Sequence, residues 1–177
     1  YLRVPLILKE TGAGISREDA LGMQQAGVKG IEVAGAGGTS WAAVEHYRSL
    51  EAGDRKRAAL ARTFWDWGIP TVASLLEVCT VEGLEVVGSG GMTNGIEVTK
   101  ALALGATLGG IAHRVLRPAV EGVQRLRDEL EIITDEVRVA MALVGARRIQ
   151  DLRAVPIIIS GSTAEWARQR DIAFTRR

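Results

Sequence analysis

Short apolar runs alternate with amphipathic stretches along the whole chain. The runs at residues 6–8, 31–33 and 84–87 lead into polar or glycine-rich residues, and a fourth run covers residues 107–112. Between and after these runs, apolar residues recur at a helical spacing, most extensively over residues 120–143. Strands that alternate with helices pair in parallel, and the helices cover the sheet. The pattern therefore predicts an α/β fold with four parallel strands.

Local capping signals mark where the helices begin and end. A serine, threonine or asparagine just before an amphipathic stretch can accept a hydrogen bond from the first helical turn. The helix starts that these signals predict are Ser16 (with Asp19 three residues on), Thr39 or Ser40, Thr93 or Asn94, and Ser162. Residues 58–67 are expected to form a helix that Gly68 ends, and Pro70 is expected in the first turn of the next helix. Arg117 and Pro118 are expected to open the last long helix.

The number of predicted strands is half of what a closed barrel requires. A parallel β/α barrel needs eight strands and roughly 250 residues, whereas this chain has 177 residues and four predicted strands. We therefore predict a single domain over residues 1–177, consisting of half of a TIM (β/α)8 barrel and a C-terminal helical tail. The chain starts at Tyr1 and runs directly into an apolar segment, which indicates a piece of a longer protein.

Charge and composition exclude several classes of partner. The chain has 22 basic and 21 acidic residues and a formal net charge of +1, so no broad field favours nucleic acid or a membrane surface. No apolar stretch is long enough for a membrane span. The single cysteine, Cys79, excludes an intrachain disulfide and fits a reducing compartment, and its apolar surroundings predict a buried thiol. We expect a cytoplasmic protein that holds any anion locally.

The candidate chemistry lies where the predicted strands end. In β/α barrels the functional residues lie at the carboxyl ends of the strands, which here selects Lys9, the loops at 35–40 and 88–93, and Ala112 with His113. Both glycine-rich loops precede a helix start, where backbone N–H groups and the positive helix end can hold a phosphate. Glycines in such loops also suit plain tight turns. Together the two loops predict a ligand that carries a phosphate.

Among the charged residues, Lys9 has the position that most favours a functional role. An ammonium at the end of a buried strand must be paired or solvated, and at the mouth of a barrel it can stabilise negative charge on a ligand. Glu10 could instead pair with Lys9 in a purely structural ion pair. Glu32 could face the lumen or pair with Lys29, and no function is predicted for it. His113 could contact a ligand at the rim.

The tryptophans and the remaining spacings give less information. Trp41 could form the floor of a pocket, whereas Trp65, Trp67 and Trp166 are expected in the core, as tryptophans on apolar helix faces usually are. No histidines or carboxylates have the spacing of metal ligands, and no nucleophile and base stand at a diagnostic separation. Spacing alone therefore does not identify a reaction.

Six strings, taken in order, resemble the type 2, FMN-dependent isopentenyl diphosphate isomerases, specifically their C-terminal half. They are residues 7–10, 34–41, 64–71, 89–91, 101–106 and 143–147, and the match covers nearly the whole chain. The lysine, the Gly-Gly loop and the Ala-Leu-Gly-Ala helix end are shared with FMN-dependent 2-hydroxy-acid oxidases. The Gly-Gly-Thr-Ser-Trp string at 37–41 and the Phe-Trp-Asp-Trp-Gly-Ile-Pro-Thr string at 64–71 are more specific to the isomerases.

The resemblance implies a TIM barrel that interconverts isopentenyl and dimethylallyl diphosphate. Reduced FMN would serve as the acid–base cofactor, NADPH would reduce it, and Mg2+ would hold the diphosphate. Lys9 would contact the flavin ring and stabilise its anionic reduced form, and Thr39 would bind the flavin. The residues that would surround the flavin phosphate are Gly90, Gly91, Thr93, Ala112 and His113. Ala34 and Trp41 would lie near the flavin, although the family often has serine at the first of these positions and a basic residue at Thr93.

The resemblance also implies what this chain lacks. The family's metal-binding glutamate and substrate-binding glutamine belong to the other half of the barrel, so no catalytic or metal-binding residue is expected within these 177 residues. The family's habit indicates a homo-oligomer. One alternative is a relative of the 2-hydroxy-acid oxidases, which would need a histidine base, for which His113 is the plausible candidate, and an arginine for the carboxylate. Another is a non-catalytic half-barrel that binds FMN or phosphate, or that folds against a partner because its sheet edges are exposed.

Overall fold

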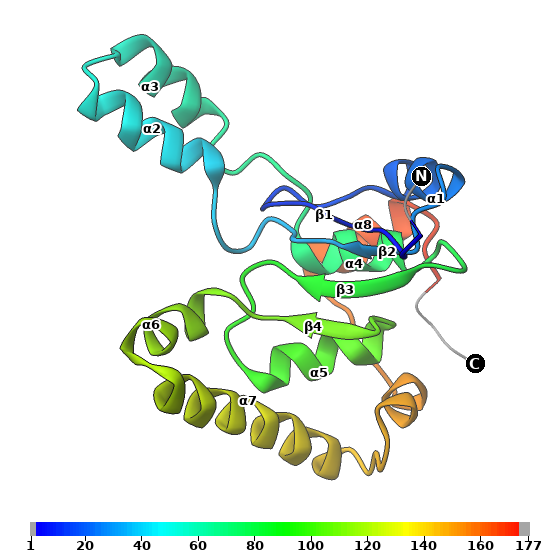
Figure 1. Ribbon diagram of the computed structural model, residues 1–177. Coiled ribbons are helices and arrows are strands. Elements are labelled where there is room, and N and C mark those ends of the chain that lie inside the picture. The colour runs from blue at the N-terminus through cyan, green and yellow to red at the C-terminus, as the bar shows by residue number, and fades with distance from the viewer. Residues whose placement is uncertain (1–2, 174–177) are drawn as a thin grey trace.

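The structure, a computed structural model, describes residues 3–173 and has a parallel sheet at its centre. The strands are β1 (Ile7–Lys9), β2 (Gly30–Glu32), β3 (Glu85–Ser89) and β4 (Leu108–Gly110), and they lie side by side in chain order (Figure 1). All three neighbouring pairs are parallel. The four-stranded parallel sheet that the sequence predicts is thereby confirmed.

Helices follow each strand and pack mainly on one side of the sheet. They are α1 (Arg17–Gln25), α2 (Trp41–Glu51), α3 (Arg55–Thr63), α4 (Thr71–Val78), α5 (Gly95–Leu104), α6 (His113–Glu121), α7 (Val123–Leu143) and α8 (Gly161–Gln169), with a 3-10 helix, η1, at Ile149–Ala154. Helices α4 and α5 pack on the sheet, α1 and α8 contact α4, and α7 runs beside α5. The α2–α3 hairpin projects away from this body (Figure 1).

Three of the predicted helix starts are confirmed by their capping bonds. The hydroxyl of Ser16 accepts a hydrogen bond from the Asp19 N–H. Ser40, rather than Thr39, caps α2, and Asn94, rather than Thr93, caps α5. In the tail, α8 begins at Gly161, so the predicted start at Ser162 is slightly late. Local side-chain chemistry therefore places most of the helices correctly.

The helix predicted over residues 58–67 is wrong at its end. It runs as α3 only to Thr63, and the chain then turns. The reason is tertiary: the Ile69 N–H donates to the Ala13 carbonyl at 2.7 Å, and the Ala36 N–H donates to the Ile69 carbonyl at 2.9 Å. These bonds hold the segment around Ile69 extended between two loops, which a helix continuing to Gly68 would prevent.

The last long helix also differs from its predicted start. Helix α6 begins at His113, four residues before the predicted start at Arg117, and contains Pro118 in its interior. The helical path is interrupted at Gly122, whose φ of 127° is a conformation that residues with a Cβ rarely adopt, and α7 starts directly after it. The amphipathic pattern over residues 120–143 thus spans a break between two helices.

The core lies between the sheet and the helices that follow its strands. Its largest fully buried apolar side chains include Ile31, Val33, Leu75 and Val78. Cys79 is half-buried and packs against this cluster, so its thiol is less enclosed than predicted. None of the helices within residues 3–173 is both long enough and apolar enough to span a membrane.

Candidate functional site at the carboxyl ends of the strands

A cavity of about 540 Å³ opens where the four strands end. All of the sequence-predicted cofactor residues except Trp41 line it: Lys9, Ala34, Thr39, Gly90, Gly91, Thr93, Ala112 and His113. These residues come from the end of β1 and from the segments after β2, β3 and β4. The expectation that they meet at one rim is met, because carboxyl ends of parallel strands share one edge of the sheet.

The two glycine-rich loops touch each other through their backbones. A Cβ on Gly90 would lie 2.4 Å from the backbone N of Gly35, and a Cβ on Gly91 would lie 2.0 Å from the Gly37 carbonyl oxygen. Gly90 and Gly91 also have φ values of 118° and 77°. The Thr71 hydroxyl fixes the contact by donating to the Gly90 carbonyl at 2.7 Å. These glycines are therefore required by the loop packing itself, and that packing shapes the cavity wall.

Lys9 pairs with Glu32, not with its neighbour Glu10. The Lys9 Nζ lies 2.5 Å from Glu32 Oε1, which also accepts a hydrogen bond from the Ser89 hydroxyl at 2.8 Å. Glu10 instead accepts from the backbone N–H groups of Gly12 and Ala13. The structural alternative for Lys9 and Glu10 is wrong, and so is a Glu32–Lys29 pair.

The sequence alone predicted no role for Glu32, and it selected Ser89 only as part of the glycine-rich loop at 88–93. Both line the cavity with Lys9, and all three side chains stand on the last residues of neighbouring strands. Lys9 and Glu32 are partners in the register of β1 and β2. In the structure a charged or polar residue ends each of these three strands, whereas the predicted runs 31–33 and 84–87 end at apolar residues, and the register that brings the three side chains together leaves no local signal in the sequence.

Arg114 is a further residue that sequence reasoning missed. Its guanidinium donates to the Thr93 carbonyl at 2.9 Å and forms ion pairs with Glu136 and Glu129. Hydrogen bonds to Glu136, and then to Glu129, hold the pKa of Arg114 above its ordinary value. The same contact with Arg114 lowers the pKa of Glu136. Arg114 thereby ties α7 to the loop before α5, next to the cavity.

Thr93 is itself engaged within its own helix start. Its backbone N–H donates to the Glu97 carboxylate at 2.6 Å, and its hydroxyl donates to the same oxygen at 3.1 Å. His113, the first residue of α6, lines the cavity near the start of that helix. The Thr93 donors would have to leave Glu97 before they could bind an anion, so His113 is the better placed of the two residues to do so.

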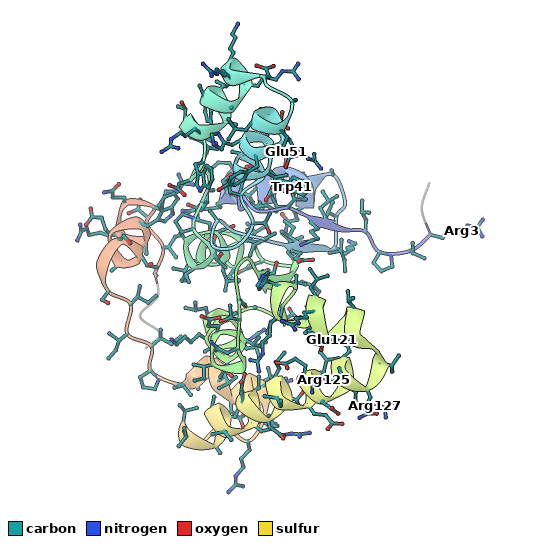
Figure 2. All side chains as sticks on the ribbon, turned by 90° about the vertical axis from the view of Figure 1, so that its left-hand side faces the viewer. Arg3, Trp41, Glu51, Glu121, Arg125 and Arg127 are labelled. Atoms are coloured by element: carbon teal, nitrogen blue, oxygen red, sulfur yellow. The ribbon has the colours of Figure 1, made fainter. Side chains whose placement is uncertain are left out.

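Trp41 lies in a neighbouring cavity of about 620 Å³, at the base of the α2–α3 hairpin. Figure 2 shows it at the end of α2 nearest the sheet, with Glu51 further out along the hairpin. Its indole N–H donates to the Thr11 carbonyl at 3.0 Å. Trp67 lines the same cavity and is 76% exposed, so its predicted place in the core is wrong. Thr11 and the glycine loop around Thr39 form the wall between the two cavities.

Metal-ligating side chains do not cluster in the part of the chain that the structure describes. Over residues 3–173, no three histidine, cysteine, aspartate or glutamate side chains come together as a possible metal site. The polar side-chain groups that line the cavity are one ammonium, one carboxylate, one imidazole and the hydroxyls of Thr11, Thr39, Ser89 and Thr93, beside a glycine-lined wall.

The model of the FMN-dependent dehydrogenase family matches residues 1–158. The chain belongs to this family. Among curated relatives, the isopentenyl-diphosphate delta-isomerase of Methanosarcina barkeri is 48% identical over 94% of this chain and 45% of its own length. That of Pyrococcus abyssi is 49% identical over 94% of the chain and 44% of its own length. The chain thus spans less than half the length of these relatives.

Solved structures of the family share the fold. A mandelate oxidase with a monooxide FMN adduct has a TM-score of 0.64 and is 27% identical, over 90% of this chain and 43% of its own. Mandelate oxidase with a difluorinated phenylpropionic acid has a TM-score of 0.65 and 26% identity. The chain has four parallel strands, half the number in a closed β/α barrel, and it covers less than half the length of each relative. Both observations show the architecture of half a β/α barrel.

Proposed function

We propose that this chain is the flavin-binding half of an isopentenyl-diphosphate delta-isomerase that acts through reduced FMN. The observation that carries the proposal is the 48% identity to named isomerases across 94% of the chain. The cavity at the strand ends supports it, because it collects residues from all four strand ends of this chain. The substrates would be isopentenyl and dimethylallyl diphosphate.

The residues around the cavity fit a flavin nucleotide. A volume of about 540 Å³ is in the usual range for small-molecule sites. A glycine-lined wall lets a ligand approach the backbone, and the start of α6 at His113 offers N–H groups and a positive helix end for a phosphate. Lys9 would place its ammonium against the flavin ring. Bound and reduced, FMN would supply the group that adds and removes protons at the substrate's double bond.

The remaining roles follow from where each side chain stands. Thr39 and Ala34 would contact the flavin, while Gly90, Gly91, Thr93, Ala112 and His113 would surround its phosphate. Trp41 would act from the neighbouring cavity, across the wall that contains Thr39. Apolar side chains such as Met92 and Ile111 would exclude water from the cavity. NADPH as reductant, Mg2+ on the diphosphate, a homo-oligomer and a cytoplasmic location complete the proposal, with the metal ligands supplied from outside this half.

A 2-hydroxy-acid oxidase is the second candidate function, favoured by the likeness to mandelate oxidase structures. Such an enzyme would need an arginine for the substrate carboxylate. Among the described residues that line the cavity there is no arginine, and His113 is the one histidine. The identity to these oxidases is also lower than to the isomerases. The isomerase is therefore the better-supported function.

The test is one purified sample of the protein, measured first for intact mass and visible spectrum and then for isomerisation. A mass well above that of 177 residues, a flavin spectrum bleached by NADPH, and Mg2+-dependent conversion of isopentenyl diphosphate are the expected results. Flavin together with oxidation of 2-hydroxy acids would instead support the oxidase. A mass equal to this chain without flavin would overturn the proposal.

A further inference from the structure

Three polar side chains form a continuous chain of contacts across the mouth of the sheet. Lys9 ends β1, Glu32 ends β2 and Ser89 ends β3. Glu32 Oε1 accepts from both neighbours, at 2.5 Å from the Lys9 Nζ and at 2.8 Å from the Ser89 Oγ. Ser89 is buried, and its Oγ accepts from the backbone N–H of Ala34 at 3.2 Å. Glu32 is thus fixed from the protein side while it holds the lysine.

The pair remains open on the cavity side. The Lys9 side chain is 54% exposed, the Glu32 side chain is 24% exposed, and both line the cavity. Within residues 3–173, Glu32 Oε2 accepts no hydrogen bond, and Lys9 uses one of its three N–H groups. Gly110, at the end of β4, leaves this space free, because a Cβ there would lie 2.9 Å from the Ser89 Cβ and 3.6 Å from Glu32 Oε1.

We propose that Glu32 is a charge-compensating and positioning residue of the flavin site, an inference that rests on the proposed function. A lysine alone would present a full positive charge to a bound flavin. The lysine paired with Glu32 presents a nearly neutral group whose N–H bonds are held in one place. Glu32 therefore limits how strongly the site favours the reduced, anionic flavin over the oxidised, neutral one.

The direction of the effect follows from charge alone. Glu32→Gln keeps an oxygen that can accept from Lys9 and Ser89 but removes the negative charge, so the site becomes one unit more positive. A charge at contact distances in a partly solvated site changes the preference for anionic over neutral ligand by on the order of tenfold. For a two-electron couple, tenfold corresponds to about 30 mV. If the role of Glu32 were purely structural, Glu32→Gln would weaken the binding of both flavin forms equally and leave this preference unchanged.

The experiment measures the dissociation constants of oxidised and of anaerobically reduced FMN on the whole purified protein. In Glu32→Gln the ratio of the oxidised to the reduced constant is expected to rise about tenfold above wild type. The matched control is Glu85→Gln, which removes a carboxylate bonded to a hydroxyl at the opposite end of the sheet, where Glu85 accepts from Thr107 at 2.6 Å. The control should leave the ratio within about twofold of wild type, because solvent and salt screen a charge at that distance.

A second variant tests the same idea without a change of charge. Ser89→Ala removes the hydroxyl that donates a hydrogen bond to Glu32. The negative charge of Glu32 is then less neutralised and disfavours the anionic flavin more strongly, so the ratio of the oxidised to the reduced dissociation constant should fall about twofold. An unchanged ratio in Glu32→Gln, or a rise in Ser89→Ala, overturns the inference while wild-type flavin binding leaves the proposed function standing. A wild-type protein that binds no FMN in either form overturns both.

Discussion

Glu77 and Glu32 are both carboxylates paired with a cation, but their hydrogen-bonding capacity is used to different extents. Glu77, on α4, is 1% exposed and accepts four hydrogen bonds. Trp166 and Arg170 donate to Oε1 at 2.7 and 3.0 Å, and the Arg17 N–H and Arg170 donate to Oε2 at 2.8 and 3.1 Å. Glu32 accepts two hydrogen bonds on one oxygen and faces an open cavity.

The difference separates a structural ion pair from one that is available to a ligand. The donors to Glu77 come from the start of α1 and from α8 and its C-cap, so this carboxylate fastens the C-terminal tail to the outer face of the half-barrel. Burial acts to raise the pKa of Glu77, but the Arg170, Arg17 and Trp166 hydrogen bonds outweigh it and hold that pKa below its ordinary value. Around Glu32 the unused oxygen and N–H groups leave room for a bound molecule.

The largest expected effect comes from removing Glu77. Glu77→Ala leaves the Arg170 guanidinium and the half-buried Trp166 and Arg17 N–H groups without their acceptor, so the free energy of unfolding should fall by about 4 kcal/mol. Glu32→Ala, which breaks a pair open to solvent, should cost no more than about 1 kcal/mol. Urea unfolding followed by tryptophan fluorescence measures both. Equal losses in the two variants would erase the distinction between the pairs.

The contribution of Glu77 should also depend on pH in a defined direction. A carboxyl group whose pKa is lower in the folded than in the unfolded protein contributes stability above its unfolded pKa, and loses it as the pH falls through the folded value. The difference in unfolding free energy between wild type and Glu77→Gln should therefore be full near pH 7 and shrink below a pH of about 4. A difference that grows on acidification would contradict the assigned charge state.

Sequence reasoning succeeded where the determinants are local. Ser16, Ser40 and Asn94 cap helices through bonds to residues three positions away, and such signals can be read directly from the chain. The placement of Lys9 at the rim followed from the strand that precedes it. The end of α3 could not be predicted, because a bond between Ala36 and Ile69 stops the helical pattern.

The ionic partners were harder to predict for the same physical reason. Lys9 and Glu32 are 23 residues apart, and Glu77 and Arg170 are 93 apart. Their pairing depends on strand register and on how the tail folds back, neither of which leaves a local periodicity. The residues for which the family resemblance implies a cofactor contact line the cavity, apart from Trp41, but the resemblance gave no role to Glu32, whose contact with Lys9 became visible only in three dimensions.

The next largest expected effect is on FMN affinity and comes from replacing Lys9. Lys9→Met removes the ammonium that faces the cavity, so the affinity for reduced FMN should fall by about thirtyfold, while the unfolding free energy changes little. The matched control is Lys29→Met, an exposed lysine at the other end of the sheet, which should leave FMN affinity unchanged. Equilibrium titration by flavin fluorescence gives both values. Equal affinities in the two variants would remove Lys9 from the flavin site.

The smallest effect concerns the tryptophan that completes the Glu77 site. Trp166→Phe keeps most of the aromatic surface but removes one of the four donors to Glu77, so the free energy of unfolding should fall by about 1.5 kcal/mol. Trp67→Phe, at an exposed position, should stay within about 0.5 kcal/mol of wild type. Neither change should alter FMN affinity. Because neither Glu77 nor Trp166 lines the cavity at the strand ends, a loss of FMN affinity in Trp166→Phe would mean that the tail supports the flavin site, and the two ion pairs could then no longer be treated as independent.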